Sequence, residues 1–135
     1  MSDLQRVYDF LIQCGTYYIA TIDGDQPRVR PFGTAAIFED KLYIQTSNLK
    51  NVFSQIQKNN NVELSAFDGE KWIRLSGKLI RDERIEAKKY VLDMHPSLKA
   101  MYSPEDEKTE VFYFESGTAT AYLSSFNDAD EILKF

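Results

Sequence analysis

Six or seven short β-forming segments, most of them joined by turns, leave this chain few folds to choose from. The clearest pair is residues 62–67 and 72–80, with a hairpin turn at 68–71 between them. In the second segment one face carries Ile73, Leu75, Gly77 and Leu79, and the other carries Trp72, Arg74, Ser76 and Lys78. The other segments with strand composition are residues 17–22, 27–38, 42–46, 111–115 and 118–123.

Residues 27–38 are too many for one straight strand, and Pro31 and Gly33 predict a bulge or bend in the middle. Helical periodicity predicts helices at residues 4–14, capped by Ser2 or Asp3, at 49–58, and at 82–94, capped by Asp82, with a short helical piece at 97–102. The apolar residues of the tail, which ends at Phe135, indicate that the tail docks on the fold. The pattern predicts a mainly β fold, a small antiparallel barrel with inserted helices.

The composition favours one globular domain over residues 1–135, because 43% of the residues are hydrophobic and 27% are charged. The net charge of −5 disfavours nucleic acid, including an RNA-binding barrel, and anionic membranes, which both need a basic surface. The single cysteine, Cys14, is expected to be a buried thiol, and no apolar run reaches membrane-spanning length. We expect a soluble, cytoplasmic protein that holds any anion by a local cluster of cations.

One candidate cluster lies where the 42–46 strand ends and the next helix begins. Thr46, Ser47 and Asn48 have side chains that can cap the free amides of the first helical turn. Lys50 is expected inside that turn, where the helix dipole favours an anion. These groups would suit a phosphate, and the alternative is an ordinary capped helix with a solvated lysine.

Arg28 and Arg30 form a second candidate cluster, because residues two apart project from the same face of a strand. Their partners are either carboxylates, such as that of Glu63, or a bound phosphate. If their strand pairs with the 42–46 strand as a hairpin, the two arginines come within reach of Lys50.

The remaining candidates offer little catalytic chemistry. His95 is the only histidine, so it falls short of a zinc site and has no nearby nucleophile, and it is expected to decorate a helix end. Trp72 is expected to be a half-buried strand aromatic, with a platform for a planar ring as the alternative. No glycine-rich phosphate loop is present in the sequence, and no metal site is expected.

Several of these segments, in this order, resemble the flavin-binding split barrels of the pyridoxamine 5′-phosphate oxidase superfamily. The resemblance runs from Tyr17 to about Arg81, and residues 113–122 are similar to the closing strands of that family. The segments that carry it are residues 18–22, Gly24, residues 26–31, residues 42–47, Lys50 and residues 72–77. The short length and the Arg-Val-Arg-Pro run resemble the small oxidase-related proteins, including the nitroimidazole-resistance branch.

The resemblance implies a six- to seven-stranded antiparallel split barrel that forms a homodimer with FMN at the subunit interface. The positions that match cofactor contacts of the family are Arg28, Arg30, Phe32, Gly33, Thr34, Thr46, Ser47, Lys50 and Trp72. Arg30 and Lys50 match the phosphate-binding residues, and Phe32 to Thr34 match the segment whose backbone faces the flavin ring. Trp72 stands where the oxidase has a polar ring contact from the partner subunit, so the residue type differs there.

The sequence thus predicts an FMN-dependent oxidoreductase that acts on a small molecule, with NADH or NADPH as the candidate electron donor. The oxidase's C-terminal substrate-binding segment has no counterpart here, which argues against pyridoxamine phosphate oxidation. Because no side chain is dedicated to substrate chemistry, a non-catalytic flavin carrier, a sensor or a cofactor-binding barrel is the alternative. A cofactor-free barrel also stays open at this stage.

Overall fold

The structure is a computed structural model that describes residues 1–126 and 130–135. Its helices are α1 (Asp3–Cys14), α2 (Asn51–Lys58), α3 (Ile85–Met94) and the short 3-10 helix η1 (Pro96–Ala100). Its strands are β1 (Tyr17–Asp23), β2 (Gln26–Phe32), β3 (Ala36–Phe38), β4 (Lys41–Ser47), β5 (Asn61–Phe67), β6 (Lys71–Asp82), β7 (Thr109–Phe114), β8 (Thr120–Ser125) and β9 (Glu131–Lys134). In the part of the chain that is described, no helix is long and apolar enough to cross a lipid bilayer.

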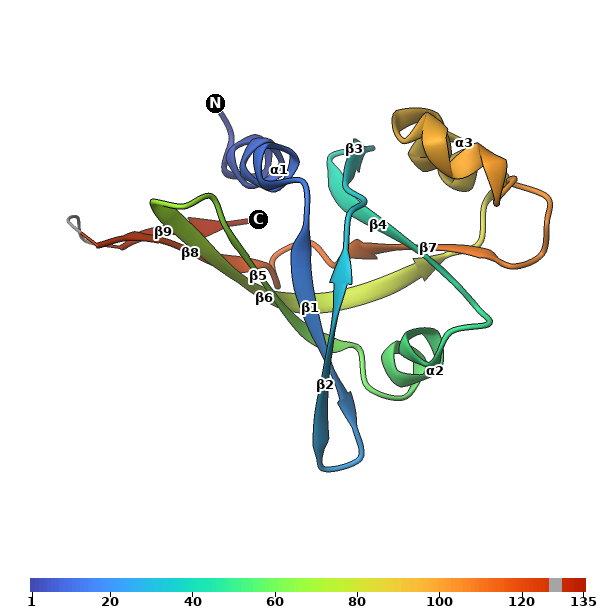
Figure 1. Cartoon of the computed structure of the whole chain (residues 1–135), viewed down its shortest axis with the longest axis horizontal. Helices are drawn as coiled ribbons and strands as arrows, with labels where there is room; N and C mark the ends of the chain where they lie inside the picture. Colours follow the sequence, from blue (N-terminus) through green and yellow to red (C-terminus); the bar gives the residue numbers. More distant parts are fainter. Residues whose placement is uncertain (127–129) are drawn as a thin grey trace.

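The strands form one antiparallel sheet in the order β2-β1-β5-β6-β7-β4-β3, and β8 and β9 branch from β6 (Figure 1). This arrangement confirms the predicted antiparallel split barrel, with nine strands where six or seven were expected. The bend at residues 33–35 divides the long segment into β2 and β3, and the tail adds β9. The end strands β2 and β3 do not pair with each other, so the described strands leave the barrel open.

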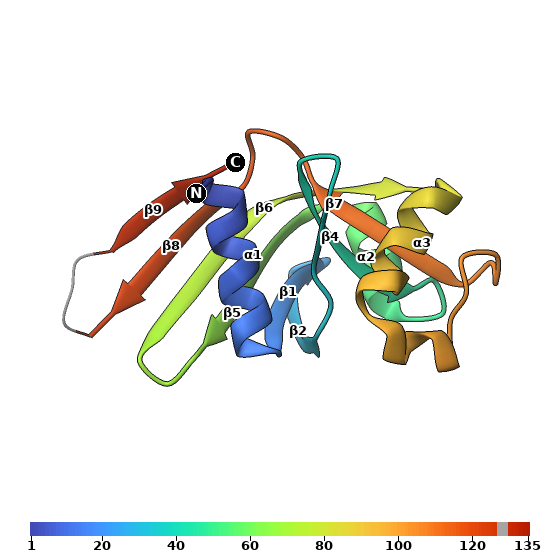
Figure 2. The ribbon, with the colours of Figure 1, turned by 90° about the horizontal axis from the view of Figure 1, so that it is seen from above.

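The larger hydrophobic core lies between the sheet and α1, which crosses over the strands (Figure 2). Alternation along β6 buries Ile73 and Leu75, as the sequence predicted, and the facing stripe of α1 buries Val7 and Leu11. The hydroxyl of Ser2 caps α1, as predicted, by accepting a hydrogen bond from the backbone N–H of Gln5 at 3.0 Å. The tail docks as predicted through Leu133, which is buried, although residues 127–129 lie outside the described part.

A smaller core joins α3 to β3, β4 and β7 through Val91 and Tyr43. Helix α3 begins at Ile85, so the prediction that Asp82 caps it was wrong. Asp82 is the last residue of β6 and accepts hydrogen bonds from the hydroxyl of Tyr43 at 2.7 Å and from Arg84. The carboxylate is therefore used to satisfy a buried hydroxyl and a guanidinium, and it is not available to cap a helix.

Helix α2 begins later than the sequence indicated. Lys50 occupies the N-cap position, outside the first turn, and no side chain caps the helix. Leu49, predicted to lie on the apolar face, is 80% exposed. A tight turn in which the N–H of Lys50 bonds to the carbonyl oxygen of Ser47 comes before the helix. The Ser47 hydroxyl accepts within this turn and the Asn48 side chain bonds to Glu107, so neither caps the helix.

Candidate functional site

Two cavities lie next to each other at the start of α2. The first has a volume of about 670 Å³ and lies between β2 and α2. The second, of about 350 Å³, lies between the bend after β2, the end of β4 and the η1 region. Pro31, Phe32 and Lys50 line both cavities, so the two cavities adjoin. Volumes of this order suit a small ligand or a cofactor.

Arg30 supplies a positive charge to the first cavity without being neutralised by a carboxylate. Its guanidinium donates to the hydroxyl of Thr21 and to the side-chain carbonyl of Gln55, both at 2.8 Å. Burial, and then the neighbouring charge of Arg28, lower the pKa of Arg30. The neutral partners fix the direction of the guanidinium and leave its charge available to an anion.

The other cations of this cavity differ in their surroundings. Arg28 lines the same cavity as Arg30, as predicted, but its guanidinium pairs with Asp23 at 3.1 Å and not with Glu63. The amine of Lys50 has no hydrogen bond or ion pair with any residue that the structure describes. Because Asp23 is matched by Arg28, the charges of Arg30 and Lys50 are uncompensated.

The predicted hairpin between β2 and β4 was wrong. Strand β2 pairs only with β1 among the described strands, and both edges of β4 are taken by β3 and β7. The two basic groups meet instead through α2, which starts just after Lys50 and reaches Arg30 through Gln55. Convergence of the two clusters was thus expected for the wrong reason, since a helix and not a strand pair brings them together.

The second cavity contains a buried hydroxyl that lacks a partner. Thr46 is 2% exposed, and its Oγ1 is the one buried side-chain oxygen or nitrogen in the described residues without a hydrogen bond. Most buried polar atoms in folded proteins are hydrogen-bonded. Since Thr46 lines the cavity, this hydroxyl is placed to bond a ligand.

The bend after β2 also lines this cavity. Phe32, Gly33 and Thr34 all line the second cavity. The hydroxyl of Tyr17 donates to the carbonyl oxygen of Thr34 at 2.6 Å, and the Thr34 hydroxyl accepts from the N–H of Gln45 at 3.0 Å. These bonds tie the bend to both β1 and β4.

Two of the residues predicted to contact a cofactor lie elsewhere in this chain. Ser47 alternates away from Thr46 along β4, and its hydroxyl accepts from the N–H of Leu49 at 3.2 Å. Trp72 lies on the other face of β6 from the core, with the guanidinium of Arg74 5.3 Å from its ring centre. Neither lines the two cavities, so their contact with a cofactor stays a prediction.

Sequence reasoning missed the far wall of the second cavity. His95 lines it, and the ring Nε2 lies 2.9 Å from the carbonyl oxygen and 3.1 Å from the N–H of Ala35. Tyr102 lines it as well, with the amine of Lys108 5.4 Å from its ring centre. Nothing in the sequence places His95 opposite a bend 60 residues away, so no local signal could have revealed it.

The loop after Tyr102 is fixed by a carboxylate. Burial would raise the pKa of Asp106, but hydrogen bonds from the N–H groups of Thr109, Ser103 and Lys108 hold it at about 2.

No cluster of His, Cys, Asp or Glu within residues 1–126 and 130–135 has the geometry to hold a metal ion.

The comparison with solved structures decides the family. A NimC/NimA family protein from Clostridium acetobutylicum is 42% identical to this chain, with a TM-score of 0.93 over 97% of this chain and 91% of the other. The chain belongs to the NimC/NimA family. No family model matches the sequence, and the search of curated proteins found no match.

More distant structures share the fold of this NimC/NimA family member. A putative pyridoxamine 5′-phosphate oxidase from Listeria innocua is 15% identical, with a TM-score of 0.67 over 93% of this chain and 98% of the other. A heme binding protein from Mycobacterium smegmatis is 12% identical, with a TM-score of 0.76 over 99% of this chain and 58% of the other. The resemblance to the oxidase-related split barrels is therefore confirmed at the level of the fold.

Proposed function

We propose that this protein binds FMN in the two adjoining cavities, with the phosphate in the first and the flavin ring in the second. The observation that carries the proposal is the pair of uncompensated cations, Arg30 and Lys50, next to the unpartnered hydroxyl of Thr46. The phosphate of FMN is close to dianionic at neutral pH. Two cations without carboxylate partners match that charge.

Each group of the phosphate site has a separate role. Arg30, oriented by Thr21 and Gln55, supplies directed N–H donors. Lys50 supplies a point charge at the N-cap of α2, and no side chain caps the first-turn amides of that helix. A third cavity of about 640 Å³ combines Lys58 with Asp23 and has no such excess of positive charge.

The second cavity suits a planar ring. The bend from Phe32 to Thr34 offers backbone groups along one side, and the hydroxyl of Thr46 can bond a ring heteroatom. His95 and Tyr102 close the far wall and reduce access of water. When bound, FMN supplies the redox chemistry, so these residues need only orient it and shield it.

We propose further that the protein is an oxidoreductase that acts on a small molecule with NADH or NADPH as the electron donor. The Nε2 of His95, the only histidine, is held by the backbone of Ala35, which argues against its use as a heme ligand. A non-catalytic flavin carrier or sensor is the second candidate, since the ring of His95 is engaged with the backbone of Ala35. Reduction of bound FMN by NADH or NADPH separates the two candidates.

We also propose that the protein is a homodimer formed through the outer face of the sheet. Directly opposed residues form a row across six strands: Pro31, Tyr18, Ser65, Arg74, Tyr122 and Ile132. Tyr18 and Ile132 are each 54% exposed, and nearby Val29 is 67% exposed, which leaves an apolar face without a cover. Pro31 also lines both cavities, so a partner on this face would border the proposed FMN site.

Fluorescence titration of the apoprotein with FMN tests the binding site. We expect Arg30→Ala and Lys50→Ala each to weaken FMN binding about 10- to 100-fold, the loss of a charge-assisted bond. Lys58→Ala is the matched control, because it removes a cation from the other end of the same helix. Wild-type protein that does not bind FMN, or binds heme in its place, would overturn the proposal.

A further inference from the structure

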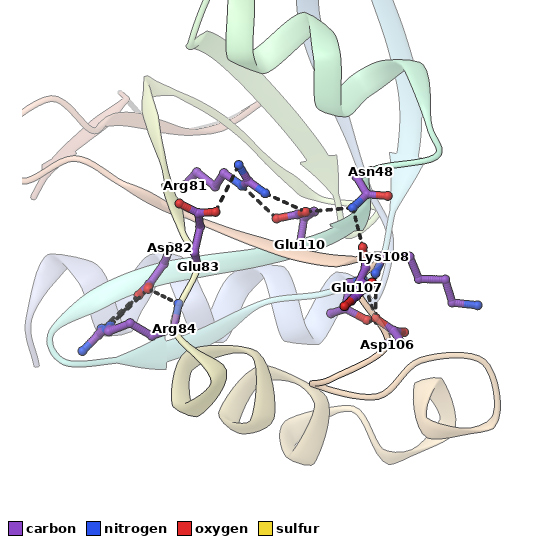
Figure 3. Close-up of polar contacts among 10 residues, drawn as sticks. Asn48, Arg81, Asp82, Glu83, Arg84, Asp106, Glu107, Lys108 and Glu110 are labelled. Atoms are coloured by element: carbon purple, nitrogen blue, oxygen red, sulfur yellow. Dashed lines mark hydrogen bonds and ion pairs between the residues drawn. The ribbon is translucent and has the colours of Figure 1, made fainter.

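Asn48 ties the loop that carries Lys50 to strand β7. Its side-chain amide donates to the carbonyl oxygen of Glu107 at 2.8 Å and to the carboxylate of Glu110 at 3.0 Å (Figure 3). Its backbone N–H donates to the carbonyl oxygen of Lys108 at 2.9 Å. Three bonds therefore fix a residue that is half-buried and two positions before Lys50.

The carboxylate that receives Asn48 is itself held in place. Glu110 is 2% exposed, and the guanidinium of Arg81 binds it with two hydrogen bonds, at 2.9 and 3.0 Å (Figure 3). A bidentate arginine pair fixes both distance and direction. The same guanidinium lies 5.1 Å from the ring centre of Phe53 in α2. The pair of Arg81 and Glu110 thus connects β6, β7 and the first turn of α2.

Neither Asn48 nor Glu110 lines the two cavities, so neither can reach a ligand placed there. The loop between Thr46 and α2 is short, and its turn is closed by the bond from the N–H of Lys50 to the carbonyl oxygen of Ser47. A shift of Asn48 would therefore move Lys50. On the basis of the proposed FMN site, we propose that Asn48 and Glu110 are positioning residues that set Lys50 for the phosphate.

The decisive comparison is between FMN and riboflavin, which has the same ring but no phosphate. We expect Asn48→Ala to weaken FMN binding about three- to tenfold, as for other residues in one coupled network, and to leave riboflavin binding unchanged. In the Lys50→Ala background the same substitution should have no further effect on FMN. Asn59→Ala is the control, because Asn59 also makes two side-chain hydrogen bonds but lies at the other end of α2.

The outcomes separate this inference from the proposed function. If Lys50→Ala weakens FMN binding but Asn48→Ala does not, or if FMN and riboflavin lose affinity equally, the positioning role is overturned and the FMN site stands. If the wild type binds no FMN, both fall. Hydrogen exchange of apoprotein gives a check without ligand: exchange at residues 49–50 should rise in Asn48→Ala, and unchanged exchange would show that Asn48 does not hold the loop.

Discussion

The unpartnered hydroxyl of Thr46 lowers the stability of the protein when no ligand is bound. A buried hydroxyl that finds no partner destabilises a fold by about 1–3 kcal/mol, whereas a bonded one does not. Thr34, across the same cavity, is similarly buried, but its hydroxyl accepts from the N–H of Gln45. The difference between two threonines in one cavity supports the proposal that the Thr46 hydroxyl bonds a ligand.

This difference predicts opposite effects of one substitution on stability and on binding. Thr46→Val should raise the stability of the apoprotein by about 1 kcal/mol and weaken FMN binding, because a methyl group replaces an unpartnered hydroxyl. Thr34→Val is the control and should lower stability, since it breaks an existing hydrogen bond. Thermal unfolding and FMN titration measure the two effects. A Thr46→Val apoprotein less stable than wild type would show that the hydroxyl has a structural partner.

At the scale of elements, β6 changes neighbours along its length. Its first part pairs with β8 up to Ser76, and its last part pairs with β7 from Leu79. Gly77 lies at the change, where a Cβ atom would stand 2.7 Å from the ring of Phe114 and 3.3 Å from the Cα atom of Ala119. The absence of a side chain lets Phe114 pack across the strand.

Gly77→Ala should therefore destabilise the fold by about 1–3 kcal/mol, the usual effect of overpacking a core. Gly33→Ala is the control for stability, because its Cβ atom would make only an ordinary contact, 3.5 Å from the carbonyl oxygen of Gly15. Chemical denaturation followed by fluorescence measures both. Equal stability of the Gly77→Ala variant and wild type would mean that the Phe114 ring moves aside freely.

Most of the helices and strands could be predicted from local sequence patterns, but the contacts between residues far apart in the sequence could not. The alternation along β6 and the stripe of α1 place side chains by their own periodicity, so both were found from the sequence. The pairing of β4 with β7 and the place of His95 depend on the whole fold, which no local pattern encodes. The start of α2 was missed because a turn at Ser47 competes with the helix for the same amides.

For the whole molecule, the outer face of the sheet predicts a dimer. Tyr18→Glu should give a monomer in sedimentation velocity at micromolar concentration, because it would bury a charge at the interface. Ile12→Glu is the control. The Ile12 side chain on α1 is 44% exposed in the wild type, so its replacement should leave the dimer intact. A wild-type monomer, or a Tyr18→Glu dimer, would contradict the proposed interface. Weakened FMN binding by the monomer would indicate that the partner completes the site.

Strand β6 serves both hydrophobic cores, and this also affects how the protein unfolds. One continuous backbone segment contributes side chains to the large core and hydrogen bonds to the strands around the small one. Neither the large core nor the small core can unfold without disrupting β6, on which the other core also depends. Heating should accordingly produce a single cooperative transition, with no stable half-folded species in which the ligand crevice survives alone.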